Sequence, residues 1–188
     1  MISHLPNALT WARIVMIPLV LGVYFLPDAV LPMPLKNLVA CGLFVLAAVT
    51  DWFDGYLARR LGITSAFGAF LDPVADKLMV CAALVLLVWL RRCDVILAFI
   101  IIGRELTISA LREWMAQLGK SRSVAVSFIG KLKTFAQMTA IPMLLFQQDI
   151  LGLPVSLLGE WLMWVAAILT LWSMAYYMNR ALKVLAEA

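Results

Sequence analysis

Histidine and cysteine, the residues that bind zinc, are scarce in this sequence. It has one histidine, His4, and three cysteines, Cys41, Cys81 and Cys93. None of them is spaced as a CxxC motif or as a Cys/His pair. This scarcity argues against a zinc site, and it argues equally against a disulfide framework.

Charged residues are also few, and this excludes an ordinary soluble fold. They make up 14% of the chain and apolar residues 64%, against about 25% and about half in a typical soluble domain. A soluble domain of 188 residues would lack the polar surface to cover so much apolar material, whereas lipid tails can solvate it. The chain also lacks a basic run with interleaved aromatic residues, so we expect no nucleic-acid partner despite the net charge of +4.

What the sequence does contain is a series of long apolar stretches. About six of them can cross roughly 30 Å of hydrocarbon, and the second is expected to continue as helix through Arg59. The connections are short and carry proline or glycine, and no internal repeat occurs, so residues 1–188 form one predicted domain. The prediction is an all-α membrane protein, a bundle of about six transmembrane helices, over Leu9–Leu26, Leu35–Val49, Phe70–Leu90, Val95–Met115, Phe135–Leu153 and Val155–Met178.

The lysine and arginine residues are distributed unequally between the two sets of helix ends. The richer set carries Arg59, Arg60, Lys120, Arg122, Lys131, Lys133, Arg180 and Lys183, and the poorer set Lys36, Arg91 and Arg92. Since cytoplasmic ends carry the excess of basic residues, both termini are predicted to be cytosolic. The adjacent Arg91 and Arg92 are an exception to this pattern.

Four aspartates are grouped near one predicted membrane face. Asp51 and Asp54 are three residues apart and Asp72 and Asp76 four apart, so each pair shares a helix face. A short loop joins the two segments, which predicts antiparallel neighbouring helices and four converging carboxylates. Such a cluster needs a cation, and carboxylate oxygens suit Mg²⁺ or Mn²⁺. A bridged pair of these ions is typical of phosphoryl displacement.

Small residues lie on the same helix faces as the aspartates. Gly55 and Ala58 lie within about 40° of Asp51 on a helical wheel, and Gly68 lies about 40° from Asp72. Residues with little side chain allow a ligand or another helix to approach the backbone. Any one of these residues has a plain structural alternative as a cap or a packing contact.

The complete run Asp51-x2-Asp54-Gly55-x2-Ala58-Arg59-x8-Gly68-x3-Asp72-x3-Asp76 resembles the signature of the CDP-alcohol phosphatidyltransferase family. The resemblance implies a six-helix membrane bundle that forms a homodimer, and a reaction in which an alcohol displaces CMP from a CDP-linked substrate. It also implies two divalent cations held by Asp51, Asp54, Asp72 and Asp76, with Asp76 as general base. Gly55, Ala58, Arg59 and Gly68 would bind the CDP moiety.

Three further polar clusters interrupt apolar stretches. Asn7, Thr10 and Arg13 open the first, Arg104, Glu105 and Arg112 lie in the fourth, and Lys133, Thr134 and Gln137 precede or open the fifth. Capping and membrane anchoring are the structural alternatives, and the adjacent Arg104 and Glu105 are expected to make a poor local ion pair. We assign the first cluster to the CDP-lipid. We assign Arg104, Arg112, Lys133, Thr134 and Gln137 to a phosphate on the acceptor, because the cations exceed what a metal-bound diphosphate needs.

These segments also resemble those of one subfamily, the bacterial phosphatidylglycerophosphate synthases. That likeness implies CDP-diacylglycerol and glycerol 3-phosphate as substrates, with the active site on the cytosolic side of the bacterial cytoplasmic membrane. Two alternatives remain open. One is the same chemistry with inositol phosphate or serine as acceptor. The other is a divalent-cation transporter, which should place its charges near mid-membrane in inverted repeats, unlike these aspartates.

Overall fold

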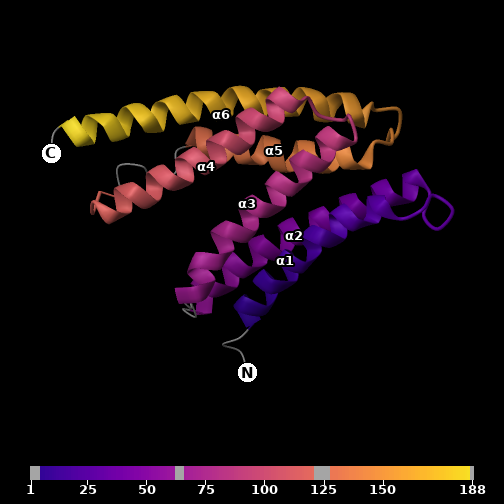
Figure 1. Ribbon diagram of the computed structural model, residues 1–188, viewed down its shortest axis with the longest axis horizontal. Coiled ribbons are helices and arrows are strands. Elements are labelled where there is room, and N and C mark those ends of the chain that lie inside the picture. The colour runs from indigo at the N-terminus through magenta and orange to yellow at the C-terminus, as the bar shows by residue number, and fades with distance from the viewer. Residues whose placement is uncertain (1–4, 62–65, 121–127, 187–188) are drawn as a thin grey trace.

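The computed structural model describes the backbone of residues 5–61, 66–120 and 128–186. The side chains of residues 5–9, 52, 54–61, 66, 67, 69 and 185 are outside the described set. Within these ranges the chain forms six α-helices and one short 3-10 turn (Figure 1), which confirms the all-α class. They are α1 Leu5–Gly22, η2 Val23–Phe25, α2 Met33–Leu61, α3 Ala66–Trp89, α4 Val95–Gln117, α5 Phe128–Phe146 and α6 Val155–Ala186.

Several helices extend beyond the predicted apolar stretches, as α6 does by continuing to Ala186, and α5 is displaced from its stretch. Helix α2 continues to Leu61, as expected, so it carries the first aspartate pair. Helix α5 begins at Phe128 and ends at Phe146, although hydropathy placed the stretch over Phe135–Leu153. The polar segment around Lys131 and Lys133 is therefore helical. Its lysines lower the local hydropathy without interrupting the helix, because lysine is a good helix former.

Helix α1 is the element that joins the two aspartate-bearing helices. It packs against both α2 and α3, and among the described residues α2 and α3 have little direct contact with each other. The short loop between α2 and α3 predicts that they are direct neighbours, and the contacts among the described residues do not show this. Carboxylates repel one another, and α1 inserts an arginine between them, as described below. Helix α5 packs on α6 and α2, and α4 packs on α6 (Figure 1).

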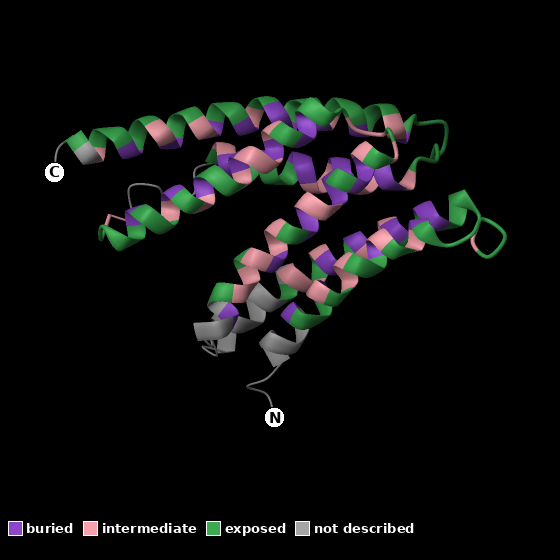
Figure 2. Cartoon of the chain, viewed as in Figure 1, coloured by how far each residue is buried: buried purple, intermediate pink, exposed green. Residues whose placement is uncertain are grey.

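The main core runs through the middle of the bundle and draws on all six helices. Fully buried alanines at helix contacts, such as Ala40 and Ala140, let the backbones approach closely, and larger residues such as Phe44, Leu84 and Ile141 fill the remaining space. A smaller cluster joins α4 to the C-terminal half of α6 through Ile108, Met115 and Tyr177. Burial follows the inward faces of the helices (Figure 2).

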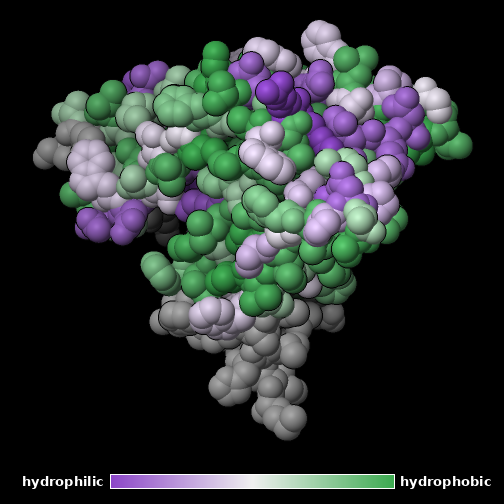
Figure 3. Space-filling view, turned by 45° about the vertical axis from the view of Figure 1, so that its right-hand side comes forward, coloured by the Kyte–Doolittle hydropathy of each residue, from purple (hydrophilic) through white to green (hydrophobic). Residues whose placement is uncertain are grey.

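The outer faces of the helices are strongly apolar. Phe99 is 76% exposed and Phe135 71%, and apolar side chains cover much of the middle of the face in Figure 3. Among the described residues two segments are long and apolar enough to cross a membrane, Met33–Asp51 and Val155–Val184. Thr10–Phe25 is a shorter apolar stretch. Helix α4 does not qualify because charged residues such as Arg104, Glu105 and Arg112 interrupt it, so a count of six spans stays a prediction.

Candidate active site

A polar cavity of about 390 Å³ opens among α2, α3, α4 and α5. Three of the four predicted aspartates, Asp51, Asp72 and Asp76, line one side of it. The opposite side carries residues of α4 and α5, namely Glu105, Arg112, Lys133, Thr134 and Gln137. The fold therefore brings an acidic wall and a mainly basic wall to one cavity, although the two groups are far apart in the sequence.

Helix α1 supplies the partners of the acidic wall. The guanidinium of Arg13, which is fully buried, lies 2.7 Å from a carboxylate oxygen of Asp51 and 3.9 Å from one of Asp76. Thr10 lies one turn earlier and donates a 2.5 Å hydrogen bond to Asp72. Arg13 thus partly offsets the repulsion among three carboxylates that line one cavity.

The donor set of the acidic wall fits hard divalent cations. Three described aspartates line this wall of the cavity, and carboxylate oxygens are the ligands that Mg²⁺ and Mn²⁺ prefer. As placed among the described side chains, no group of three or more acidic, histidine or cysteine residues is close enough to hold a metal. The fourth aspartate, Asp54, belongs to α2, but its side chain lies outside the described set. A metal at this wall therefore stays a prediction.

The basic wall is centred on Lys133 of α5. Lys133 and Gln137 are buried and share the inward face of α5 with Gly130 and Ala136, because residues three and four apart lie on one face of a helix. The ammonium of Lys133 contacts the carboxylate of Glu105. Lys133 is thus held in place by a side chain of the same cavity.

Helix α4 contributes three polar residues, at positions 105, 109 and 112. They are four and three residues apart and therefore share one face of the helix. Glu105 and Arg112 line the cavity, and Ser109 between them accepts a 2.5 Å hydrogen bond from Lys77 of α3. The sequence suggests Glu105 only as a local partner of Arg104, and no motif points to Lys77. The spacing of residues 105, 109 and 112 on one helix face was the signal for the first. The position of Lys77 beside Asp76 was a weaker signal for the second.

Arg104 does not line this cavity. Being one residue from Glu105, it points about 100° away around the helix, and its buried guanidinium donates a 3.1 Å hydrogen bond to Ser173 of α6. It does approach Glu105, at 3.5 Å, since two long side chains can bend toward each other across that angle. In this structure Arg104 contacts Glu105 and Ser173 and does not reach the cavity itself.

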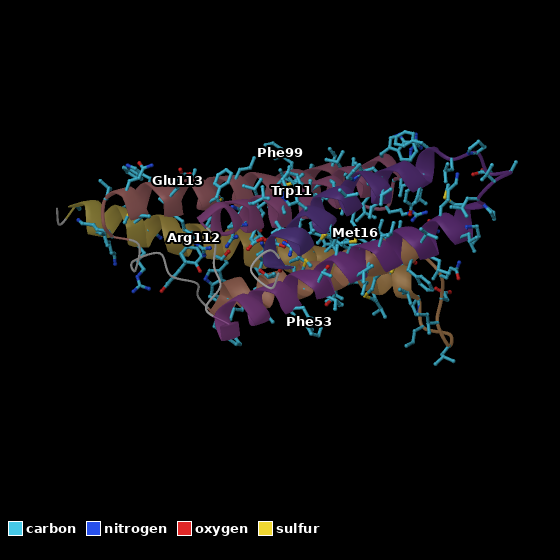
Figure 4. The ribbon with its side chains drawn as sticks, turned by 90° about the horizontal axis from the view of Figure 1, so that it is seen from below. Trp11, Met16, Phe53, Phe99, Arg112 and Glu113 are labelled. Carbon is cyan, nitrogen blue, oxygen red and sulfur yellow. The ribbon has the colours of Figure 1, made fainter. Side chains whose placement is uncertain are left out.

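Two residues that line the cavity each carry a polar atom without a hydrogen-bond partner among the described residues. The Nε of Arg112 and the Oε1 of Gln137 are buried and make no hydrogen bond to the described residues. A buried polar atom without a partner carries a desolvation cost. The guanidinium of Arg112 also lies 5.4 Å from the ring centre of Tyr177. Figure 4 shows Arg112 toward the interior, whereas Phe53 and Phe99 lie at the outer edges.

The remaining predicted site residues belong to segments with limited description. Gly68 is buried near the start of α3. The side chains of Asn7, Gly55, Ala58 and Arg59 lie outside the described residues, although α1 includes the first and α2 the other three. Their assignment to the CDP-lipid stays a prediction.

Comparison with known proteins gives a consistent result. Residues 3–172 match the sequence pattern of the CDP-alcohol phosphatidyltransferase family. The chain is similar to proteins named CDP-diacylglycerol–glycerol-3-phosphate 3-phosphatidyltransferase. It is 50% identical to the one from Sodalis glossinidius and 48% identical to the one from Salmonella typhimurium, in each case over 95% of this chain and 94% of the relative. The protein of that name from Yersinia enterocolitica is 48% identical over 98% of both chains.

Proposed function

The chain belongs to the CDP-alcohol phosphatidyltransferase family, and we propose that it transfers a phosphatidyl group from CDP-diacylglycerol to glycerol 3-phosphate. The products are phosphatidylglycerophosphate and CMP. The observation that carries this assignment is the single cavity with carboxylates on one wall and cations on the other. The names of the relatives favour this transfer over the transporter alternative, and they name glycerol 3-phosphate rather than inositol phosphate or serine.

The acidic wall serves the CDP-linked substrate. Two divalent cations, Mg²⁺ or Mn²⁺, held by Asp51, Asp54, Asp72 and Asp76 would neutralise the diphosphate and the departing CMP. Arg13 adds a fixed positive charge behind the carboxylates, where it keeps Asp51 in place. Gly55, Ala58, Arg59 and Gly68, with Asn7 and Thr10, complete the proposed site for the CDP moiety.

Asp76 is the proposed general base. A hydroxyl oxygen of glycerol 3-phosphate attacks the phosphorus that carries the diacylglycerol, the bond from that phosphorus to the CMP oxygen breaks, and the hydroxyl proton passes to Asp76. Asp76 suits this role because its carboxylate lines the cavity and its one ion pair with a described basic residue, Arg13, is long, at 3.9 Å. A looser contact leaves a carboxylate oxygen available to accept a proton.

The basic wall serves the phosphate of the acceptor. Lys133 and Arg112 line the cavity directly, and charge-assisted hydrogen bonds to a phosphate are about twice as strong as neutral ones. In the structure Lys133 contacts Glu105, so an incoming phosphate competes with that carboxylate. Thr134 and Gln137 add neutral hydrogen-bonding groups at the same wall, and Arg104 acts through Glu105.

The placement in the membrane is part of the proposal. The apolar helices and the bacterial relatives support a bacterial inner-membrane protein. We propose that six helices cross the bilayer, that both termini and the active site face the cytosol, and that the chain forms a homodimer. The acyl chains of the substrate would extend sideways into lipid between the helices.

An assay of the purified protein tests the reaction. CMP release from CDP-diacylglycerol is followed with glycerol 3-phosphate, inositol phosphate or serine as acceptor, with and without a chelator. Of the three acceptors, we expect only glycerol 3-phosphate to support CMP release. Excess chelator should abolish this release, and added Mg²⁺ or Mn²⁺ should restore it. Release that depends on another acceptor would refute the substrate assignment, and full activity in excess chelator would refute the metal assignment.

A further inference from the structure

A second cavity, of about 560 Å³, opens at the opposite end of the bundle. It is formed by the α3–α4 loop, the end of α5 and the first turns of α4 and α6, and its lining includes Arg91, Cys93, Asp94, Glu160 and Trp164. Fifteen residues of helix and turn separate Arg91 from Asp76, about 22 Å at 1.5 Å per residue. This cavity is therefore distinct from the one lined by the aspartates, and the loops that form it lie at the far ends of the helices in Figure 1.

Arg92 and Lys36, at this same end, already have structural partners. Arg92 donates to the backbone carbonyls of Leu144 and Leu145 at the end of α5, and to the side chain of Asn37 at 2.8 Å. Lys36 donates to the carbonyl of Leu26 and to Asp28, both at 2.6 Å. Their charges stabilise helix ends and a loop, so neither is free for a ligand.

Arg91 occupies a backbone position that normally suits glycine. The amides of Arg91 and Arg92 donate to the carbonyls of Val88 and Leu87, which is the Schellman pattern of a helix C-terminus. Arg91 has a φ of 58°, in the left-handed region where a side chain is unfavourable. Helix α4 ends in the same pattern, with Gly119 at the equivalent position and a φ of 70°. The turn itself gives no reason for an arginine at residue 91.

Glu160 supplies an opposite charge at the same cavity. Asp94 caps α4 by accepting a 2.7 Å hydrogen bond from the amide of Ile96. Glu160 is exposed, and no ion pair to it or to Arg91 occurs among the described residues. One cation and one anion, both without a protein partner in the described set, thus border one cavity near the ends of apolar helices.

We propose that this cavity binds the headgroup of a zwitterionic phospholipid, with the phosphate on Arg91 and a primary ammonium on Glu160. The two charges match the two ends of such a headgroup, and the cavity lies where the proposed membrane placement puts the second bilayer interface. Trp164, 52% exposed at its wall, has the amphipathic ring typical of that depth. The inference rests on the membrane placement and is independent of the reaction.

Native mass spectrometry of the purified protein in detergent tests this site. Phosphatidylethanolamine and phosphatidylglycerol with identical acyl chains are titrated separately, so that both present the same phosphodiester and only the former carries an ammonium. We expect tighter binding of phosphatidylethanolamine. Glu160→Gln should remove that preference, and Arg91→Gly should weaken both lipids about tenfold, as expected for the loss of a charge-assisted contact.

The choice of variants separates ligand binding from folding. Arg91→Gly places at residue 91 the amino acid that the turn favours, so its melting temperature should not fall. Asp149→Asn removes an exposed carboxylate from the α5–α6 loop, outside the cavity lining, and should leave both titrations unchanged. Equal binding of the two lipids by the unmodified protein, or a preference that survives Glu160→Gln, would overturn the proposal. CMP release is measured in parallel and should be normal in Arg91→Gly and Glu160→Gln. If the unmodified protein releases no CMP, the proposed reaction is wrong and the lipid site is unaffected.

Discussion

The two ends of the helix bundle use basic side chains in different ways. At the end opposite the aspartates, Arg92 and Lys36 donate to backbone carbonyls at helix ends, and also to the side chains of Asn37 and Asp28. At the aspartate end, Arg13 and Lys133 contact carboxylate side chains that line a cavity. A charge bound to a helix terminus stabilises the fold and has little capacity to change partners. A charge bound to a side chain at a cavity can exchange that partner for a substrate.

This difference also explains the exception in the distribution of basic residues. Arg91 and Arg92 lie on the side that is poor in lysine and arginine. Arg92 is there because the last carbonyls of α5 need donors, and its guanidinium also lies 5.9 Å from the ring centre of Tyr24. A basic residue that satisfies a local structural need carries little information about membrane orientation.

The largest expected effect comes from Asp76 at the aspartate end. Asp76→Asn removes a proton acceptor and a proposed metal ligand while keeping the shape of the side chain. We expect the rate of CMP release to fall by about 10³-fold or more, within the range for general acid–base catalysis and metal ligation together, with an unchanged melting temperature. Asp149→Asn is the matched control. If Asp76→Asn keeps a tenth of the activity, Asp76 is not the base.

At the other end, the change with the largest effect is Arg92→Leu. It removes the donors to the Leu144 and Leu145 carbonyls and to Asn37, and we expect it to destabilise the protein by about 2–4 kcal/mol. The Michaelis constants of the protein that remains folded should not change. Thermal unfolding in detergent measures the loss, with the neighbouring Arg91→Gly as control. If Arg92→Leu changed the substrate affinity and left the stability normal, the structural role assigned to Arg92 would be wrong.

A smaller effect is expected from Lys133→Met. The apparent Michaelis constant for glycerol 3-phosphate should rise about tenfold, the value of one lost charge-assisted hydrogen bond, with little change for CDP-diacylglycerol. Lys131→Met is the control, because Lys131 lies two residues away on the exposed side of α5. An increase only in the apparent Michaelis constant for CDP-diacylglycerol would instead assign Lys133 to the site of that substrate.

The smallest effect concerns Cys93 in the α3–α4 loop. Burial, together with the negative charges of Asp94 and Glu160, raises the pKa of its thiol to about 11. Because only the thiolate reacts, maleimide labelling in a Cys41→Ala, Cys81→Ala background should be slow at pH 8 and still accelerating at pH 10. Adding Glu160→Gln should raise the rate by about threefold or less, since burial is the larger cause. A rate that levels off below pH 9 would contradict this.

The spacing of residues already determined much of this protein. Apolar length predicted the helices, and α2, α3 and α4 lie close to their expected bounds. The intervals between the aspartates placed three described carboxylates at one cavity, because helical periodicity is a local property of the chain. The signature around them also indicates the family, because its spacing is a property of the sequence alone.

Tertiary structure decided which side chain faces which neighbour. Arg104 and Glu105 are adjacent in sequence, yet Glu105 lines the cavity and Arg104 faces Ser173 of α6. Helix α1 lies between the two aspartate helices and brings Arg13 to Asp51, and Arg92 reaches the end of α5. A sequence specifies the angle of each residue around its own helix. The rotation and partner of that helix depend on packing with distant segments, which no local pattern contains.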